Sequence, residues 1–84
     1  MWKVLLHPAV HKFLNGLDKN TRERIENKLR EMCDDPFRFL EHFEGKDYYK
    51  LRIGDFRALI DVDFSNKELL VRVLDRRGRI YKQL

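Results

Sequence analysis

Residues 51–57, LRIGDFR, decide the fold of this chain, because a Gly-Asp pair stands there between two stretches of β-prone residues. A two-residue loop that begins with glycine is typical of a type II′ hairpin turn. The stretch therefore predicts two antiparallel strands, Tyr48–Ile53 and Phe56–Asp63, joined by Gly54 and Asp55.

The two faces of this predicted hairpin differ in chemistry. Side chains alternate between faces along a strand, so the face with Leu51 and Phe56 is apolar, whereas the other carries Lys50 and sets Arg52 opposite Arg57. Like charges directly opposite each other destabilise a sheet by roughly 0.2 to 1 kcal/mol. That cost favours a surface that binds an anion between the arginines over a purely structural one.

The chain before the hairpin predicts a strand and two helices. Residues 2–6 form a short apolar run, and Pro8 then opens a helix. Asn20, with Glu23 three residues later, resembles the capping box of a second helix, which residues 34–36, Asp-Asp-Pro, end. Apolar residues recur at helical spacing in both segments: Val10, Phe13, Leu14 and Leu17, then Ile25, Leu29, Met32 and Cys33.

The chain after residue 36 predicts a connector, the hairpin and one more strand. Residues 37–47 form the connector and residues 69–75 the last strand. The predicted architecture is α+β: an N-terminal helical hairpin packed on one face of a small, mainly antiparallel, four-stranded sheet. Alternation puts Leu69, Val71 and Val73 toward the core and leaves Leu70, Arg72, Leu74 and Arg76 on the open face, so we expect the cationic surface to widen there.

Length and charge limit the classes of protein. The 84 residues predict a single domain, 1–84, and the whole net charge of +4 lies in residues 45–84, which hold ten basic and six acidic side chains. This asymmetry favours a polyanion or an acidic protein segment as partner. No apolar run has the length of a membrane helix, and the N-terminus lacks the pattern of a signal peptide, so we expect a cytoplasmic protein without a membrane partner.

The last ten residues, 75–84, read DRRGRIYKQL and carry cations around one aromatic ring. Such a segment suits single-stranded RNA, because cations bind phosphates and a ring stacks on an unpaired base. The candidate RNA-binding residues of the open face and tail are Arg72, Arg76, Arg77, Arg79, Tyr81 and Lys82.

Neither a metal nor a small-molecule cofactor is expected. The single Cys33 excludes an internal disulfide and a cysteine zinc site. The histidines are scattered, and His7 and His11 lack the glutamate after the first histidine that a zinc-binding H-E-x-x-H helix requires.

The order of strand, helical hairpin, LRIGDFR hairpin, further strand and terminal RGRIYK resembles the toxin subunits of the RelE/ParE superfamily, above all archaeal RelE-like mRNA interferases. This resemblance covers nearly the whole chain. It implies a RelE-like toxin of a type II toxin–antitoxin system, an endoribonuclease that cuts mRNA on the ribosome without metal and so inhibits translation. It also implies a RelB-like antitoxin as partner.

The resemblance assigns roles to matching residues. Lys50 and Arg52 match the basic pair before the turn, Arg57 the arginine that ends the hairpin motif, and Tyr81 the terminal tyrosine. The catalytic terminal arginine matches Arg77 or Arg76, and Arg79 is a third candidate. Lys50 would accept a proton, because arginine stays protonated in proteins.

Two other functions remain open. A ParE-like toxin would inhibit DNA gyrase without catalysis, and an RNA-binding module of similar fold would have no activity of its own. For the antitoxin, we expect an acidic amphipathic segment to dock beside Leu59, Leu70 and Leu74, which alternation leaves on the open face.

Overall fold

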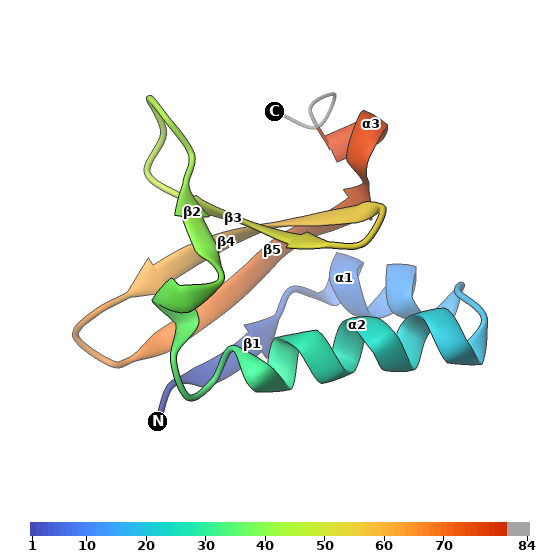
Figure 1. The fold of residues 1–84 in the computed structure, drawn as a ribbon, viewed down its shortest axis with the longest axis horizontal. Coiled ribbons are helices and arrows are strands. Elements are labelled where there is room, and N and C mark those ends of the chain that lie inside the picture. The colour runs from blue at the N-terminus through green and yellow to red at the C-terminus, as the bar shows by residue number, and fades with distance from the viewer. Residues whose placement is uncertain (81–84) are drawn as a thin grey trace.

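The computed structural model describes residues 1–80, which form a five-stranded sheet with α1 and α2 on one of its faces (Figure 1). The strand order is β1-β5-β4-β3-β2; β1 runs parallel to β5, and the other neighbours are antiparallel. The elements are β1 (Lys3–Leu6), α1 (Pro8–Asn15), α2 (Lys19–Glu31), the 3₁₀ turn η1 (Pro36–Arg38), β2 (Leu40–His42), β3 (Tyr49–Ile53), β4 (Phe56–Asp63), β5 (Glu68–Arg76) and α3 (Arg77–Ile80).

The predicted hairpin is confirmed in its turn and its register. Gly54 has φ 57°, and Asp55 is not in the positive-φ region, which is the pattern of a type II′ turn. Ile53 pairs with Phe56 beside the turn, and Arg52 pairs with Arg57 next along. The local sequence therefore places the two arginines opposite each other.

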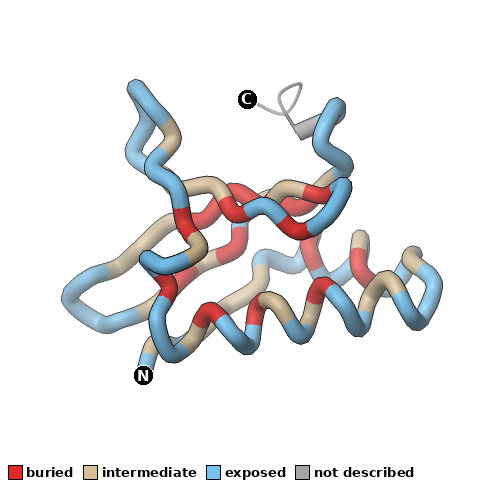
Figure 2. Tube along the Cα trace, viewed as in Figure 1, coloured by how far each residue is buried: buried red, intermediate tan, exposed pale blue. Residues whose placement is uncertain are grey.

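The core lies between the helices and the covered face of the sheet, and Figure 2 shows the buried residues on the inner sides of α1 and α2 and within the strands. Both predicted apolar stripes contribute, since Val10 and Leu14 of α1 and Ile25 and Leu29 of α2 are buried. The sheet supplies Leu51, Ile53, Phe56, Ala58, Ile60, Leu69, Val71 and Leu74.

The prediction of four strands is wrong, because the connector contains a fifth. The short strand β2 pairs with β3, with Leu40 opposite Leu51 and Glu41 opposite Lys50. A strand of three residues shows no alternation that a sequence pattern can detect. It forms because β3 presents a free edge to the returning chain.

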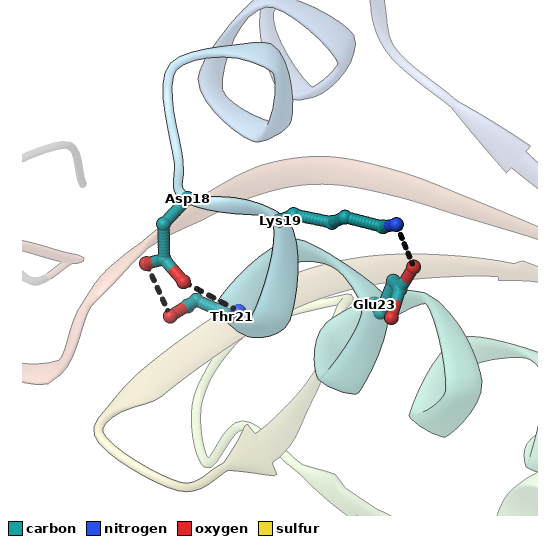
Figure 3. Close-up of polar contacts among 4 residues, drawn as sticks. All are labelled: Asp18, Lys19, Thr21 and Glu23. Atoms are coloured by element: carbon teal, nitrogen blue, oxygen red, sulfur yellow. Dashed lines mark hydrogen bonds and ion pairs between the residues drawn. The ribbon is translucent and has the colours of Figure 1, made fainter.

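The predicted capping box at Asn20 and Glu23 is also wrong, because the N-cap of α2 is Asp18, two residues before Asn20. Asp18 is the N-cap: its carboxylate accepts from the Thr21 amide at 3.0 Å and from the Thr21 hydroxyl at 2.6 Å (Figure 3). These bonds lower the pKa of Asp18, the Thr21 hydroxyl more than its amide. Figure 3 also shows Glu23 turned toward Lys19, with 4.0 Å between the charged atoms.

A β-bulge changes the predicted faces of β5. Leu59 pairs with Val73 but Ile60 pairs with Val71, so Arg72 is an extra residue on β5. An extra residue reverses the alternation beyond it. Leu74 accordingly joins the core at 4% exposure, and Val73 is only half-buried, the reverse of the prediction.

The bulge also moves Arg76. It pairs with Phe56, and its guanidinium lies 5.1 Å from the centre of that core ring. Arg76 therefore lies on the face that the helices cover, and the predicted place on the open face is wrong.

Candidate active site

The open face is the side of the sheet away from α1 and α2, and Lys50, Arg52 and Arg57 meet on it. Lys50 and Arg52 stand two residues apart on β3, and Arg57 lies opposite Arg52 on β4. Arg52 is exposed, whereas Lys50 and Arg57 are half-buried. The structure thus brings together three of the residues that the sequence singled out.

Carboxylates stand among these cations, contrary to the prediction of a widening positive surface. The Lys50 ammonium lies 3.7 Å from a Glu41 carboxylate oxygen. Asp75, on β5, is the register partner of Arg57 on the side away from Arg52. The bulge at Arg72 makes Asp75 the partner of Arg57, because the extra residue shifts the pairing of β5 with β4 by one position.

Arg72 also has a carboxylate beside it. Its Nε lies 3.3 Å from an Asp61 carboxylate oxygen, and both side chains are about half exposed. Pairs at this exposure contribute about 0 to 1 kcal/mol. Arg72 is therefore available to a stronger anionic ligand at small cost.

The connector positions Lys50. Glu41 comes from β2, and the Phe43 ring lies 5.6 Å from the Lys50 ammonium. Phe43 itself packs on Tyr48, with 5.5 Å between ring centres. Sequence reasoning did not identify Glu41 and Phe43, because only the pairing of β2 with β3 brings them to Lys50.

The C-terminal segment starts at the hairpin turn. The Arg77 amide donates to the Asp55 carbonyl at 2.8 Å, which fixes the first residue of α3 beside the Gly54–Asp55 turn. Figure 1 shows α3 and the β2–β3 connection on the side of the sheet opposite α1 and α2. Arg77 and Arg79 are exposed on α3. Tyr81 and Lys82 lie outside the described residues.

The histidines take no part in this cluster. His7 caps α1, because its Nδ1 accepts from the Ala9 amide at 3.1 Å. His42 packs on the ring of Tyr49, with 5.1 Å between ring centres. Within residues 1–80, no three His, Cys, Asp or Glu side chains come together in a way that could hold a metal ion.

The apolar surface predicted for an antitoxin is mostly buried. Leu59 is 3% exposed and Leu74 4%, so neither offers a docking surface. The exposed apolar side chains lie at the other end of the sheet from the hairpin turn, where the rings of Phe37 and Phe64 stack with centres 5.6 Å apart. No helix of the described chain has the length and apolarity needed to cross a membrane.

Known proteins resemble this chain in sequence and in structure. The family model described as ParE toxin of type II toxin-antitoxin system, parDE, matches residues 4–80. None of the curated proteins matches.

Three solved structures illustrate the likeness in fold. A chain of the archaeal RelE–RelB complex from Pyrococcus horikoshii is 27% identical, with a TM-score of 0.77, over 93% of this chain and 97% of that chain. A chain of the RelBE2 toxin–antitoxin complex from Mycobacterium tuberculosis is 16% identical, with a TM-score of 0.79, over 90% and 98%. The isolated RelE toxin from E. coli is 19% identical, with a TM-score of 0.75, over 99% and 94%.

Proposed function

This chain belongs to the family of ParE toxins of type II toxin–antitoxin systems, and we propose that it is a RelE-like toxin that inhibits translation by cutting mRNA on the ribosome. The proposal places its action in the cytoplasm, with ribosomes and mRNA as partners and without a metal or cofactor. The observation that carries it is the convergence of Lys50, Arg52 and Arg57 on the open face.

Cleavage of RNA by its own 2′-hydroxyl needs a proton acceptor, stabilisation of the charge on the phosphorane and help for the leaving 5′ oxygen. Lys50 is the proton acceptor in this proposal. Arg57 and Arg77 hold the phosphate, and Arg52, exposed opposite Arg57, stabilises its developing charge. Tyr81 is proposed to stack on a base.

Such a site contains few acid–base groups and should be slow on free RNA. The ribosome is proposed to compensate by holding the message in place, since correct positioning can lower a barrier by about 7 to 11 kcal/mol. Arg79 and Lys82 remain proposed contacts to the RNA backbone, and Arg72 would be released from Asp61 when RNA binds. Arg76 is not proposed as an RNA contact, because it lies on the face that the helices cover.

The proposed protein partner is a RelB-like antitoxin. Support comes from the archaeal RelE–RelB complex from Pyrococcus horikoshii. One chain of that complex is 27% identical to the present chain, and the match covers 93% of the present chain. An acidic antitoxin segment would neutralise Arg52 and Arg57 and so keep RNA from the site.

A second candidate is a non-catalytic toxin that inhibits DNA gyrase, and the observation in its favour is that the matching family model is that of ParE toxins. A non-catalytic RNA-binding module is the third. The open-face cations favour the nuclease over a gyrase inhibitor, because a protein that inhibits gyrase without catalysis does not need two arginines that bind phosphate, Arg52 and Arg57, beside a lysine that accepts a proton, Lys50.

Primer extension on mRNA translated in a purified system tests the proposal. The protein should produce cuts only when ribosomes are present, and cutting should persist in EDTA when polyamine keeps the ribosomal subunits together. A parallel supercoiling assay with gyrase serves as the comparison. Gyrase inhibition without any mRNA cuts would favour the second candidate, and RNA binding without cuts or inhibition the third.

A further inference from the structure

A pocket of about 470 Å³ opens between α2 and the end of β3, and of the three open-face cations Lys50, Arg52 and Arg57, Arg52 lines it. One side of it is a stripe of α2 at positions i, i+3, i+4 and i+7, which share one face of a helix. The other side is the last part of β3 and the turn. The lining residues are Arg24, Asn27, Lys28, Glu31, Arg52, Ile53 and Gly54.

The fold leaves this pocket open for two reasons. The strand β2 pairs with β3 only as far as Leu51, so no strand of the described chain covers the edge at Arg52. Gly54 lacks a side chain: a Cβ there would lie 3.7 Å from a guanidinium nitrogen of Arg24. The hairpin turn therefore comes close to Arg24 without filling the space between them.

The charges of the pocket do not balance. Arg24, Lys28 and Arg52 face a single carboxylate, Glu31, whose oxygen lies 3.5 Å from the Lys28 ammonium. Within residues 1–80, no carboxylate lies within 4.0 Å of the guanidinium nitrogens of Arg24 or Arg52. Two exposed arginines from different elements, Arg24 and Arg52, thus line one pocket, an arrangement that suits an anion with several oxygens.

Arg52 connects the pocket to the open face. It is the register partner of Arg57 and also lines the pocket, so it belongs to both surfaces. A polyanion held at Arg57 reaches the pocket by passing Arg52 at the sheet edge. The pocket is also large enough for a sugar and its phosphate, whereas a carboxylate group alone would leave most of it empty.

We propose that this pocket binds a backbone phosphate of the RNA that flanks the phosphate at Arg57, so that the strand leaves the open face over the edge of β3. The inference rests on the proposed function for the identity of the polyanion. Arg24 is the new binding residue, and Arg52 serves both phosphates.

The test measures binding rather than cleavage. A short single-stranded RNA with 2′-O-methyl sugars cannot be cut by its own hydroxyl, and its affinity for the full-length protein is measured by fluorescence anisotropy over a range of salt concentrations. Each lost phosphate contact lowers the slope of log K against log salt by about 0.7 for single strands. We expect a loss of that size in Arg24→Gln.

The matched control is Arg22→Gln, which removes the same charge from the same helix but lies outside the pocket lining. It should retain the wild-type slope. Thermal melting of both variants checks the fold. As a second measurement, a 5′-phosphorylated dinucleotide should shift the side-chain NMR signal of Arg24 and leave that of Arg22 in place.

Equal salt slopes for the two variants would overturn the inference. So would a loss of antitoxin affinity in Arg24→Gln with RNA affinity unchanged, because the pocket would then bind a carboxylate of the antitoxin. Failure of the proposed function gives a different result: the wild-type protein would bind the methylated RNA through Arg24 and yet cut no mRNA on ribosomes.

Discussion

The two faces of the β3–β4 hairpin come from alternate residues of the same strands, yet they serve different ends. On the covered face, Leu51 and Ile60 are at most 1% exposed and pack beneath the helices. On the open face, Arg52 is exposed and stands opposite the half-buried Arg57. The difference teaches that one short segment supplies both core residues of the fold and cations of the candidate site, separated only by the alternation of side chains.

The largest expected effect is on the covered face. Ile60→Ala removes a side chain with 0% exposure from the centre of the sheet, and such truncations cost about 2 to 5 kcal/mol of unfolding free energy. Urea denaturation measures the loss. Ile60→Val, which leaves a smaller cavity, should cost about 0.5 to 1.5 kcal/mol. Equal losses in the two variants would show that cavity size does not control stability here.

The next effect separates the faces most directly. Arg57→Ala should lower mRNA cleavage on ribosomes about 10²- to 10³-fold, because a charge that stabilises the transition state is lost. The unfolding free energy should change by less than about 1 kcal/mol. The substitution removes the repulsion between Arg57 and its register partner Arg52, and it also removes the attraction between Arg57 and its register partner Asp75, so the two effects oppose each other.

The control for Arg57 is Arg22→Ala, which removes an equal charge from α2 outside both the open face and the pocket. Cleavage by this control should match the wild type. Wild-type inhibition of a cell-free translation system by Arg57→Ala would contradict the proposed catalytic role.

A smaller effect concerns the carboxylates of the open face. Glu41→Gln removes the partner that lies 3.7 Å from the Lys50 ammonium, and cleavage at limiting RNA should rise by at most about fivefold, the equivalent of ~1 kcal/mol. The cause is loss of repulsion between Glu41 and phosphate. Glu44→Gln, an exposed carboxylate of the same connector, is the control. A fall in cleavage would mean that Glu41 is needed to position Lys50.

The smallest effect tests how α2 is fixed over the covered face. Hydrogen bonds from Thr21 lower the pKa of Asp18 below its ordinary value of 3.8, so the charged cap stabilises the folded state above that pH and loses its effect as pH falls through the lowered pKa. Asp18→Ala should therefore lower Tm at pH 5 to 7 and approach the wild-type Tm in stronger acid. If the difference in Tm between the wild type and Asp18→Ala were the same at every pH, the charge of the Asp18 cap would not be the cause of that difference.

Local features of the fold were predictable from sequence. A two-residue turn that begins with glycine fixes the pairing of the strands beside it, so the opposition of Arg52 and Arg57 follows from LRIGDFR alone. The helical stripes, with Val10 and Ile25 inward, were equally predictable, because their period is short compared with the helix.

Features that depend on distant residues were not predictable. The Asp18 cap competes with Asn20, a residue of similar chemistry two positions away, and only the backbone of the folded chain shows that Asp18 takes the N-cap position. The pairing of β2 brings Glu41 to Lys50, although the sequence of β2 alone shows no strand pattern.

What the sequence by itself determined is therefore the hairpin, its cationic face and the resemblance to RelE-like toxins, because each depends on residues close together in the chain. The tertiary structure alone decided which carboxylates enter that face and where the pocket beside Arg52 lies. The bulge at Arg72 turns Val73 and Leu74 to new faces and makes Asp75 the partner of Arg57. Its position depends on how β5 fits at once between β4 and the parallel strand β1, a constraint from both ends of the chain that no local pattern contains.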